Sequence, residues 1–83
     1  LKVYPNPFND LLYFEFSTAT DSRVMLELYD LKGSKIRTLF EDRVRGGQLY
    51  NVQFMSSELT TGTYYYRLVS DNEVKTGKLV KNY

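Results

Sequence analysis

The sequence predicts an all-β protein, and two observations carry that prediction. Apolar and polar residues alternate through most of the chain, which is the period of a half-buried β-strand. Short segments rich in Gly, Asn and Asp separate the alternating runs, and no stretch of helical periodicity lasts ten residues. About seven short strands at this close spacing are typical of an immunoglobulin-like β-sandwich of antiparallel strands.

Length and composition narrow the function classes. At 83 residues we expect a single domain over residues 1–83. Lys and Arg number 11 against 10 Asp and Glu, and this balance argues against a dedicated binder of nucleic acid or of an anionic membrane. No apolar run approaches the length of roughly 18 residues that a membrane span needs. The chain has no start Met and no signal peptide, so we expect a fragment or C-terminal module of a longer protein, with Tyr83 as a natural end.

The N-terminal segment YPNPF, which follows a short strand expected over residues 2–4, predicts an entry turn. Pro5 and Pro7 lack an amide donor, so this segment cannot be a central strand. The residue before each proline, Tyr4 or Asn6, is restricted to extended conformations. We therefore expect a stiff, extended corner that caps a sheet edge.

Four long runs alternate regularly enough to assign the face that packs inward. A fifth run, SKIRTLF, changes parity between Ile36 and Leu39, which predicts a β-bulge or a strand end there. The inward residues of the four regular runs are Leu12, Phe14 and Phe16; Val24, Leu26 and Leu28; Tyr50, Val52 and Phe54; and Tyr64, Tyr66 and Leu68.

Three turns follow from residue type. The segment DLKG predicts a hairpin in which Asp30 opens the turn and Gly33 takes a left-handed conformation. Asp71-Asn72 predicts a tight two-residue hairpin, since both residues tolerate positive φ. The segment RVRGG at residues 43–47 predicts a longer, mobile connection.

The segment LTTGTY predicts a tyrosine corner. Residues 55–62 are expected to form a short helical turn that delivers Leu59 into the core. Gly62 and Tyr64 then stand where the Tyr hydroxyl can bond to the backbone just upstream. The alternative is that Tyr64 is simply a core aromatic; we favour the corner because Leu and Gly occupy its companion positions.

The closing run VKTGKLVKNY carries three lysines at a spacing of three: Lys75, Lys78 and Lys81. In a straight strand Lys78 would share a face with Val74 and Val80, which is poor core material. A bulge or strand break at Gly77 would shift the parity, so that Val74 and Leu79 both face inward. The lysines would then point mostly outward and protect an edge strand from accidental pairing.

The residue inventory argues against an enzyme. Without His or Cys, the commonest pairs of nucleophile and base are missing, and we expect no catalytic residue. Two carboxylate pairs, Asp71 with Glu73 and Glu41 with Asp42, are better explained as solvated loop charges.

Binding chemistry is equally sparse. Zinc is disfavoured without His or Cys, and the oxygens of Asn6, Asn9 and Asp10 are too few to predict calcium, so we expect no metal and no cofactor. The segments RVRGG and YYYRLV resemble RNA-binding fragments but lack a basic field. Three tyrosines expected to be exposed could form a sugar-binding or protein-binding surface if they cluster: Tyr13, Tyr29 and Tyr65.

An ordered series of motifs covers nearly the whole chain. The segments are YPNPFND (4–10), VMLELYDLKGSKI (24–36), YNVQF (50–54), LTTGTYYYRL (59–68) and KLVK (78–81). In this order and spacing they resemble the type A C-terminal sorting domain of the Bacteroidetes type IX secretion system, also called the Por secretion system.

The resemblance implies a seven-stranded immunoglobulin-like sandwich that is the last module of an exported cargo protein. It implies passage through the periplasm, recognition by the outer-membrane translocon and its shuttle proteins, and delivery to the cell surface or medium. A sortase-type cysteine peptidase would cut upstream of Leu1 and attach the cargo to lipopolysaccharide.

The resemblance also implies which residues the translocon and sortase recognise: Gly62, Tyr64, Tyr66, Leu68, Lys78, Leu79, Val80 and Lys81. The residues that carry the structural motifs are Pro5, Asn6, Pro7, Gly33 and Leu59. An exposed sheet edge could bind a partner by strand addition, and a terminal strand could exchange between copies, so we expect a monomer or a strand-swapped dimer.

Two other interpretations stay open. An accessory β-sandwich of an exported protein could bind carbohydrate or protein. The immunoglobulin-like part of flagellar hook-capping proteins has similar hairpins, but the Pro-x-Pro opening and the KLVK end favour the sorting domain.

Overall fold

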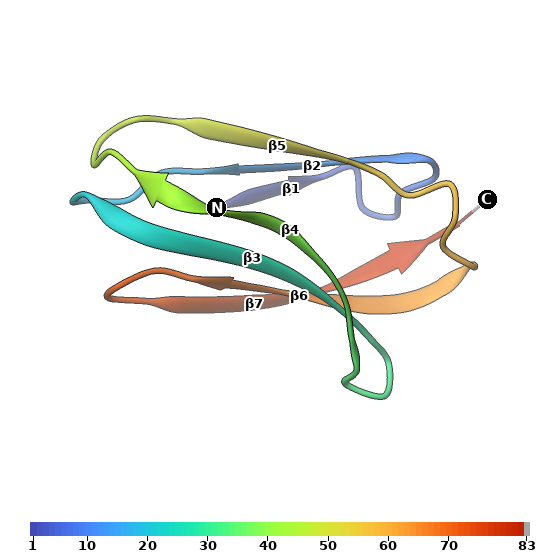
Figure 1. Ribbon diagram of the computed structural model, residues 1–83. Coiled ribbons are helices and arrows are strands. Elements are labelled where there is room, and N and C mark those ends of the chain that lie inside the picture. The colour runs from blue at the N-terminus through green and yellow to red at the C-terminus, as the bar shows by residue number, and fades with distance from the viewer. Residues whose placement is uncertain (83) are drawn as a thin grey trace.

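The computed structural model describes residues 1–82, which form seven β-strands in two antiparallel sheets packed face to face (Figure 1). The predicted all-β, immunoglobulin-like sandwich is confirmed. The expected chain end, Tyr83, lies outside the described residues. The strands are β1 (Lys2–Tyr4), β2 (Leu11–Phe16), β3 (Ser22–Asp30), β4 (Lys35–Val44), β5 (Tyr50–Met55), β6 (Gly62–Val69) and β7 (Val74–Lys81).

The two sheets exchange strands in a Greek-key manner. One sheet has the order β1-β2-β5 and the other has the order β4-β3-β6-β7. Strands β2 and β5 pair although β3 and β4 lie between them in sequence. Likewise, β3 and β6 pair although β4 and β5 lie between them. This arrangement leaves β7, the last strand, at one edge of the four-stranded sheet (Figure 1).

The core lies between the sheets and contains the inward residues that alternation predicts. Within β2, β3, β5 and β6, the assigned inward residues are buried or half-buried, so those four assignments are confirmed. The buried apolar set is Phe8, Leu12, Phe14, Phe16, Val24, Leu26, Leu28, Val44, Phe54, Tyr64, Leu68 and Leu79.

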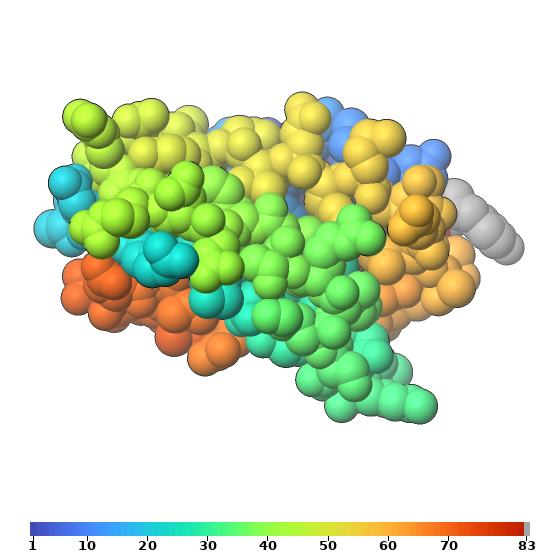
Figure 2. Space-filling view, in the orientation of Figure 1, coloured from blue at the N-terminus to red at the C-terminus, as the bar shows by residue number. Residues whose placement is uncertain are grey.

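The predicted change of parity in β4 is confirmed as two β-bulges. The β3–β4 pairing passes from Leu26↔Phe40 to Glu27↔Thr38, and from Leu28↔Arg37 to Tyr29↔Lys35. The two skipped residues are Leu39 and Ile36. Each bulge adds local twist and bend, and the tip of this hairpin turns away from the sandwich (Figures 1 and 2).

The DLKG turn forms as predicted. The Gly33 amide donates to the Asp30 carbonyl at 3.0 Å, and one Asp30 carboxylate oxygen accepts from the amides of Lys32 and Ser34 at 2.9 Å. Gly33 has φ +87°, a left-handed conformation that a residue without Cβ adopts at little cost.

Two turn predictions are corrected. The β6–β7 turn is tight, closed by the Ser70 amide donating to the Glu73 carbonyl at 2.9 Å, but Asp71-Asn72 does not use positive φ: within residues 1–82 only glycines do. The segment 43–47 is not a free loop. Its first two residues belong to β4, and the Gly47 amide donates to the Thr18 carbonyl at 2.7 Å, tying the segment to the β2–β3 turn.

Residues 55–62 do not form a helix. The Leu59 amide donates to the Ser56 carbonyl at 3.0 Å, which closes a single turn, and Leu59 packs against the core as expected. YPNPF bends and is not extended, and both X–Pro peptide bonds are cis. No membrane-crossing helix is found among residues 1–82.

The bulge predicted at Gly77 is wrong. Strand β7 pairs with β6 without a register shift from Val69↔Val74 to Gly62↔Lys81, so the ladder runs unbroken through Tyr66↔Gly77. The reason lies in the partner strand. The Tyr66 ring occupies the space above Gly77, where a Cβ would lie 2.4 Å from its atoms. The strand stays regular because its inward position opposite Tyr66 has no side chain.

The unbroken strand also reverses three assignments of side-chain direction. Val74 is 56% exposed and does not face inward. Lys81 shares the inward face with Leu79 and is buried. Lys75, opposite the inward Leu68, lies on that same face but is exposed near the start of β7, and Lys78 points outward as predicted.

Candidate functional site

The candidate site is the hairpin of β6 and β7, because all the residues expected to be recognised lie on these two strands. Four of these eight residues are buried and only two are exposed. The buried ones are Tyr64, Leu68, Leu79 and Lys81; the half-buried ones are Tyr66 and Val80; the exposed ones are Gly62 and Lys78. The hairpin therefore presents little side-chain surface from this set.

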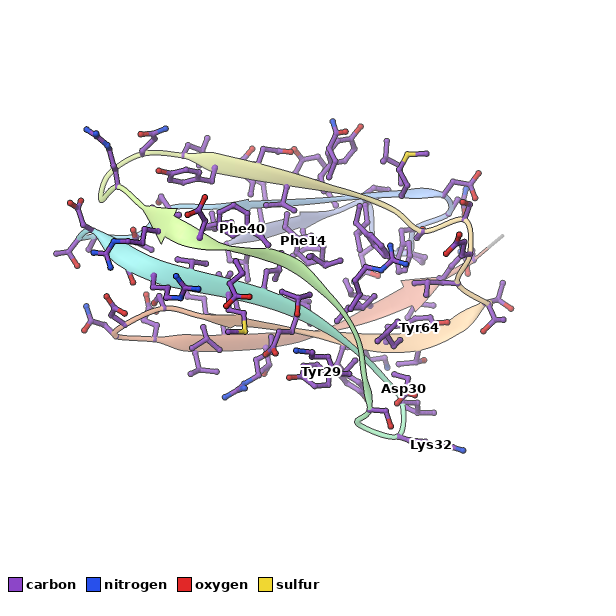
Figure 3. All side chains as sticks on the ribbon, in the orientation of Figure 1. Phe14, Tyr29, Asp30, Lys32, Phe40 and Tyr64 are labelled. Atoms are coloured by element: carbon purple, nitrogen blue, oxygen red, sulfur yellow. The ribbon has the colours of Figure 1, made fainter. Side chains whose placement is uncertain are left out.

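Tyr64 forms the predicted tyrosine corner. Its hydroxyl donates to the Thr60 carbonyl at 2.7 Å, and the residue is 7% exposed. In Figure 3 Tyr64 lies on the inner side of β6. The bond ties the first residues of β6 to the β5–β6 connection, so it fixes where the hairpin begins.

Replacing Tyr64 with phenylalanine isolates this hydrogen bond. The ring stays in the core while the Thr60 carbonyl loses its donor, so we expect the free energy of unfolding to fall by about 1–2 kcal/mol. Urea unfolding followed by circular dichroism measures the change. An unchanged midpoint would show that Tyr64 acts only as a core aromatic.

Tyr66 connects the two sheets. Its ring meets the edge of Phe14 at a centroid distance of 5.6 Å and an interplanar angle of 73°, a favourable aromatic geometry. The other partner of the ring is Gly77. Burial raises the pKa of the Tyr66 hydroxyl. Because the folded state disfavours the phenolate, this residue should cost stability only at alkaline pH.

Lys81 anchors the end of β7. Its ammonium donates to the Ser56 carbonyl, and the residue is 6% exposed. Ser56 is itself held, since its hydroxyl donates to the Asn9 carbonyl at 2.8 Å and its amide donates to the Asp10 carbonyl at 2.7 Å. Lys81 thus joins the end of the chain to the β5–β6 connection and the N-terminal segment.

The N-terminal segment covers the outer edge of β7. The Asn6 side-chain amide donates to the Lys78 carbonyl, and its oxygen accepts from the Val80 amide, both at 3.1 Å. The Phe8 amide donates to the Val80 carbonyl at 2.9 Å, and the Asn82 amide donates to the Phe8 carbonyl at 2.8 Å. YPNPF therefore caps a sheet edge, as predicted. This edge is closed to strand addition over residues 78–82.

A comparison with protein-family models decides the family. The model described as the secretion system C-terminal sorting domain matches residues 2–82. The chain belongs to this family. It is therefore a sorting signal of type IX secretion, as the sequence motifs indicated. Among curated proteins none matches the chain.

Membership sets the general role of the sorting domain. Such a signal interacts with the type IX secretion machinery, is attached to an N-terminal cargo, and serves export to the cell surface or out of the cell. Domains of this family are generally non-catalytic.

The three tyrosines considered for a binding surface do not form one patch on the sorting domain. Tyr13 lies on the three-stranded sheet, where it stacks on Tyr4 at a centroid distance of 5.3 Å. Tyr29 and Tyr65 are cross-strand partners on the four-stranded sheet. The tyrosines are therefore divided between the two outer faces.

The remaining candidates for chemistry in the sorting domain are occupied by structural contacts. Glu41 pairs with Arg23 at 3.0 Å, and Glu73 pairs with Lys75 at 3.8 Å. The side-chain amide of Asn6, considered for calcium, is bonded to β7. Over residues 1–82, acidic side chains nowhere gather in a group of three that could hold a metal ion.

Two residues that build this site were not predicted from the sequence pattern. Phe8, at 1% exposure, is a core residue that no alternating run contains. Ser56 is fully buried and accepts the Lys81 ammonium through its carbonyl. Neither has a local signal, because the partners of each are distant in sequence.

Proposed function

We propose that residues 1–83 form one non-catalytic domain that directs a cargo protein, joined upstream of Leu1, through the outer-membrane type IX translocon. The cargo crosses the periplasm with the domain folded. A sortase-type cysteine peptidase then removes the domain and attaches the cargo to the cell surface. The family match over residues 2–82 carries this proposal.

We further propose that recognition depends on the shape of the β6–β7 hairpin together with its exposed residues, Gly62 and Lys78. The buried members of the predicted set act indirectly, because they hold the hairpin in place. Gly62 has φ +149°, a conformation that favours glycine, so its part is to set the backbone at the start of β6.

A reporter fusion tests the function. Residues 1–83 are placed behind a signal peptide and a fluorescent reporter in a type IX-competent bacterium, and surface and medium fractions are assayed. We expect the reporter outside the outer membrane. A reporter that stays in the periplasm while the domain is folded contradicts the proposal.

Lys78→Ala tests direct recognition. Lys78 is exposed, so the free energy of unfolding should change by no more than about 0.5 kcal/mol. Export of the reporter should nevertheless fall several-fold. Lys75→Ala is the matched control, because Lys75 is also an exposed lysine of β7 and has only a long ion pair at 3.8 Å. Equal export by both variants would show that Lys78 is not recognised by the translocon.

A further inference from the structure

A groove lies between the β3–β4 hairpin and the outer face of β6 and β7. Its volume is about 550 Å³, and its lining is largely apolar. The walls include Tyr29, Leu31 and Lys32 from the hairpin, and Tyr65, Arg67 and Thr76 from the sheet. Figure 3 shows Tyr29 on the outer side of the sheet and Lys32 at the tip of the turned hairpin.

The groove results from the two bulges in β4. Without them, β3 and β4 would continue the plane of the sheet, and the hairpin would project past its end. The extra residues Leu39 and Ile36 bend the strand pair, so the tip projects from the outer face and forms one wall of the groove. The tip leaves Leu31 67% exposed, although it is a large apolar side chain.

The charges around the groove are mostly positive. Glu27 on the groove side of β3 has a side chain only 8% exposed, and its carboxylate is shared by Lys35 at 3.3 Å and Arg67 at 3.7 Å. The Tyr29 hydroxyl donates to the same carboxylate at 2.9 Å. This cluster holds the two cations beside the apolar floor.

Of the described residues that line the groove, only Asp30 is acidic. The Asp30 carboxylate accepts two backbone amides of its own turn. Lys32 lines the groove, and Lys78 stands directly across from Tyr65 on β7. The groove therefore complements a ligand that combines an apolar group with negative charge.

One end of the groove reaches an open sheet edge. Both backbone polar groups of Val80 point away from β6, since they bond to Phe8 and Asn6. By the alternation of an antiparallel ladder, the amide and carbonyl of Thr76 point to the same outer edge. The Asn6 and Phe8 bonds begin at Lys78, so they do not cover Thr76.

We propose that this groove binds an extended, acidic peptide segment of a partner protein. The segment pairs with the edge of β7 at Thr76, places an aromatic or aliphatic side chain against Tyr65 and Tyr29, and directs carboxylates to Lys32, Arg67 and Lys78. The open backbone edge favours a peptide over an anionic glycan, because only a peptide can continue the ladder. This inference goes beyond the proposed sorting role, with which it shares Lys78.

Binding to the purified 83-residue chain tests the proposal without any export assay. The probe is the capped peptide Glu-Val-Phe-Val-Glu-Glu, titrated against the ¹⁵N-labelled protein. We expect amide shifts centred on Tyr65, Thr76 and Lys78, and slower hydrogen exchange at the Thr76 amide. The capped peptide Lys-Val-Phe-Val-Lys-Lys should bind at least about tenfold more weakly.

Two variants and one control locate the contact. Tyr65→Ala removes the exposed ring and should weaken binding about tenfold. Thr76→Pro removes an edge amide together with the Thr side chain, a change that an edge strand tolerates, and should weaken binding to a similar extent. Tyr13→Ala, on the opposite sheet, should bind as the unmodified chain does. A probe N-methylated at alternate residues gives the same backbone test on the unmodified protein.

Several results would overturn the proposal. Equal affinity for the acidic and basic peptides would show that the cations around the groove do not select an acidic ligand. Unchanged binding by Tyr65→Ala would show that the peptide does not occupy the groove. Unchanged binding of the N-methylated probe would show that the peptide does not pair with the edge of β7. Binding of tetragalacturonate in the groove without binding of the peptide would assign the surface to an anionic glycan instead.

Discussion

Replacing Phe14 with alanine should lower the free energy of unfolding by about 3–5 kcal/mol, the loss typical of a buried phenylalanine. Phe14 is fully buried in β2, and its cross-strand partners are Val3 and Val52. Its ring also meets Tyr66 across the sandwich at 5.6 Å. Truncation would remove one of the contacts through which the three-stranded sheet supports the β6–β7 hairpin.

Denaturant unfolding measured by circular dichroism checks this value. Domains of this size have a total stability of only about 5–15 kcal/mol, so Phe14→Ala could be largely unfolded. Phe14→Leu keeps part of the volume and should lose less, which allows a quantitative comparison. Gln53→Ala, at an exposed position of neighbouring β5, is the control and should change stability by at most about 0.5 kcal/mol. A loss below about 1 kcal/mol for Phe14→Ala would contradict the packing described here.

Replacing Lys81 with glutamate should cost about 3 kcal/mol or more. The wild-type ammonium is buried and donates to the Ser56 carbonyl. A carboxylate at this position would face the Ser56 carbonyl oxygen, and neither group can donate a hydrogen bond to the other. The buried negative charge would therefore be unpaired, which is costly. Lys81→Met keeps the aliphatic stem and leaves only the carbonyl unpaired, so its loss should be about 1–3 kcal/mol.

Lys78→Glu tests whether the stability loss of Lys81→Glu comes from burial of the side chain or from the charge reversal alone. It makes the same charge reversal on the same strand, three residues away, but at an exposed side chain. We expect a change of no more than about 0.5 kcal/mol. Thermal and urea unfolding of the three variants should therefore give the order Lys81→Glu, Lys81→Met, Lys78→Glu, from least to most stable. Equal losses for the two glutamate variants would show that Lys81 is not buried in solution.

These stability data also bear on export. A double substitution at Lys78 and Lys81 would mix recognition with folding, because one lysine is exposed and the other is buried. Single variants avoid this. Loss of export by Lys78→Ala with unchanged stability would concern recognition, whereas loss by Lys81→Glu with reduced stability would concern the fold of the signal.

Local pattern was sufficient for much of the fold. Alternation assigned the inward faces of β2, β3, β5 and β6, because a strand with one buried face must repeat every two residues. The parity change in β4 indicated its bulges for the same reason. The Asp30–Gly33 turn and the tyrosine corner depend on a few neighbouring residues, and both form as predicted.

The same reasoning was wrong where the decisive contact came from another strand. Gly77 was predicted to interrupt β7 because a lysine between valines suits no core. The ladder continues because the Tyr66 ring fills the space above Gly77. No pattern within β7 contains that information.

The amino-acid sequence by itself determined the fold class, the inward faces of four strands, the turn at Gly33 and membership of the sorting-domain family. Tertiary structure alone decided that Lys81 is buried, that Asn6 covers the edge of β7 at Lys78 and Val80, and that an apolar groove with cations around it lies beside the β3–β4 hairpin. The physical reason is distance along the chain. Asn6 and Val80 are separated by 74 residues, and only the closed sandwich brings their polar groups together.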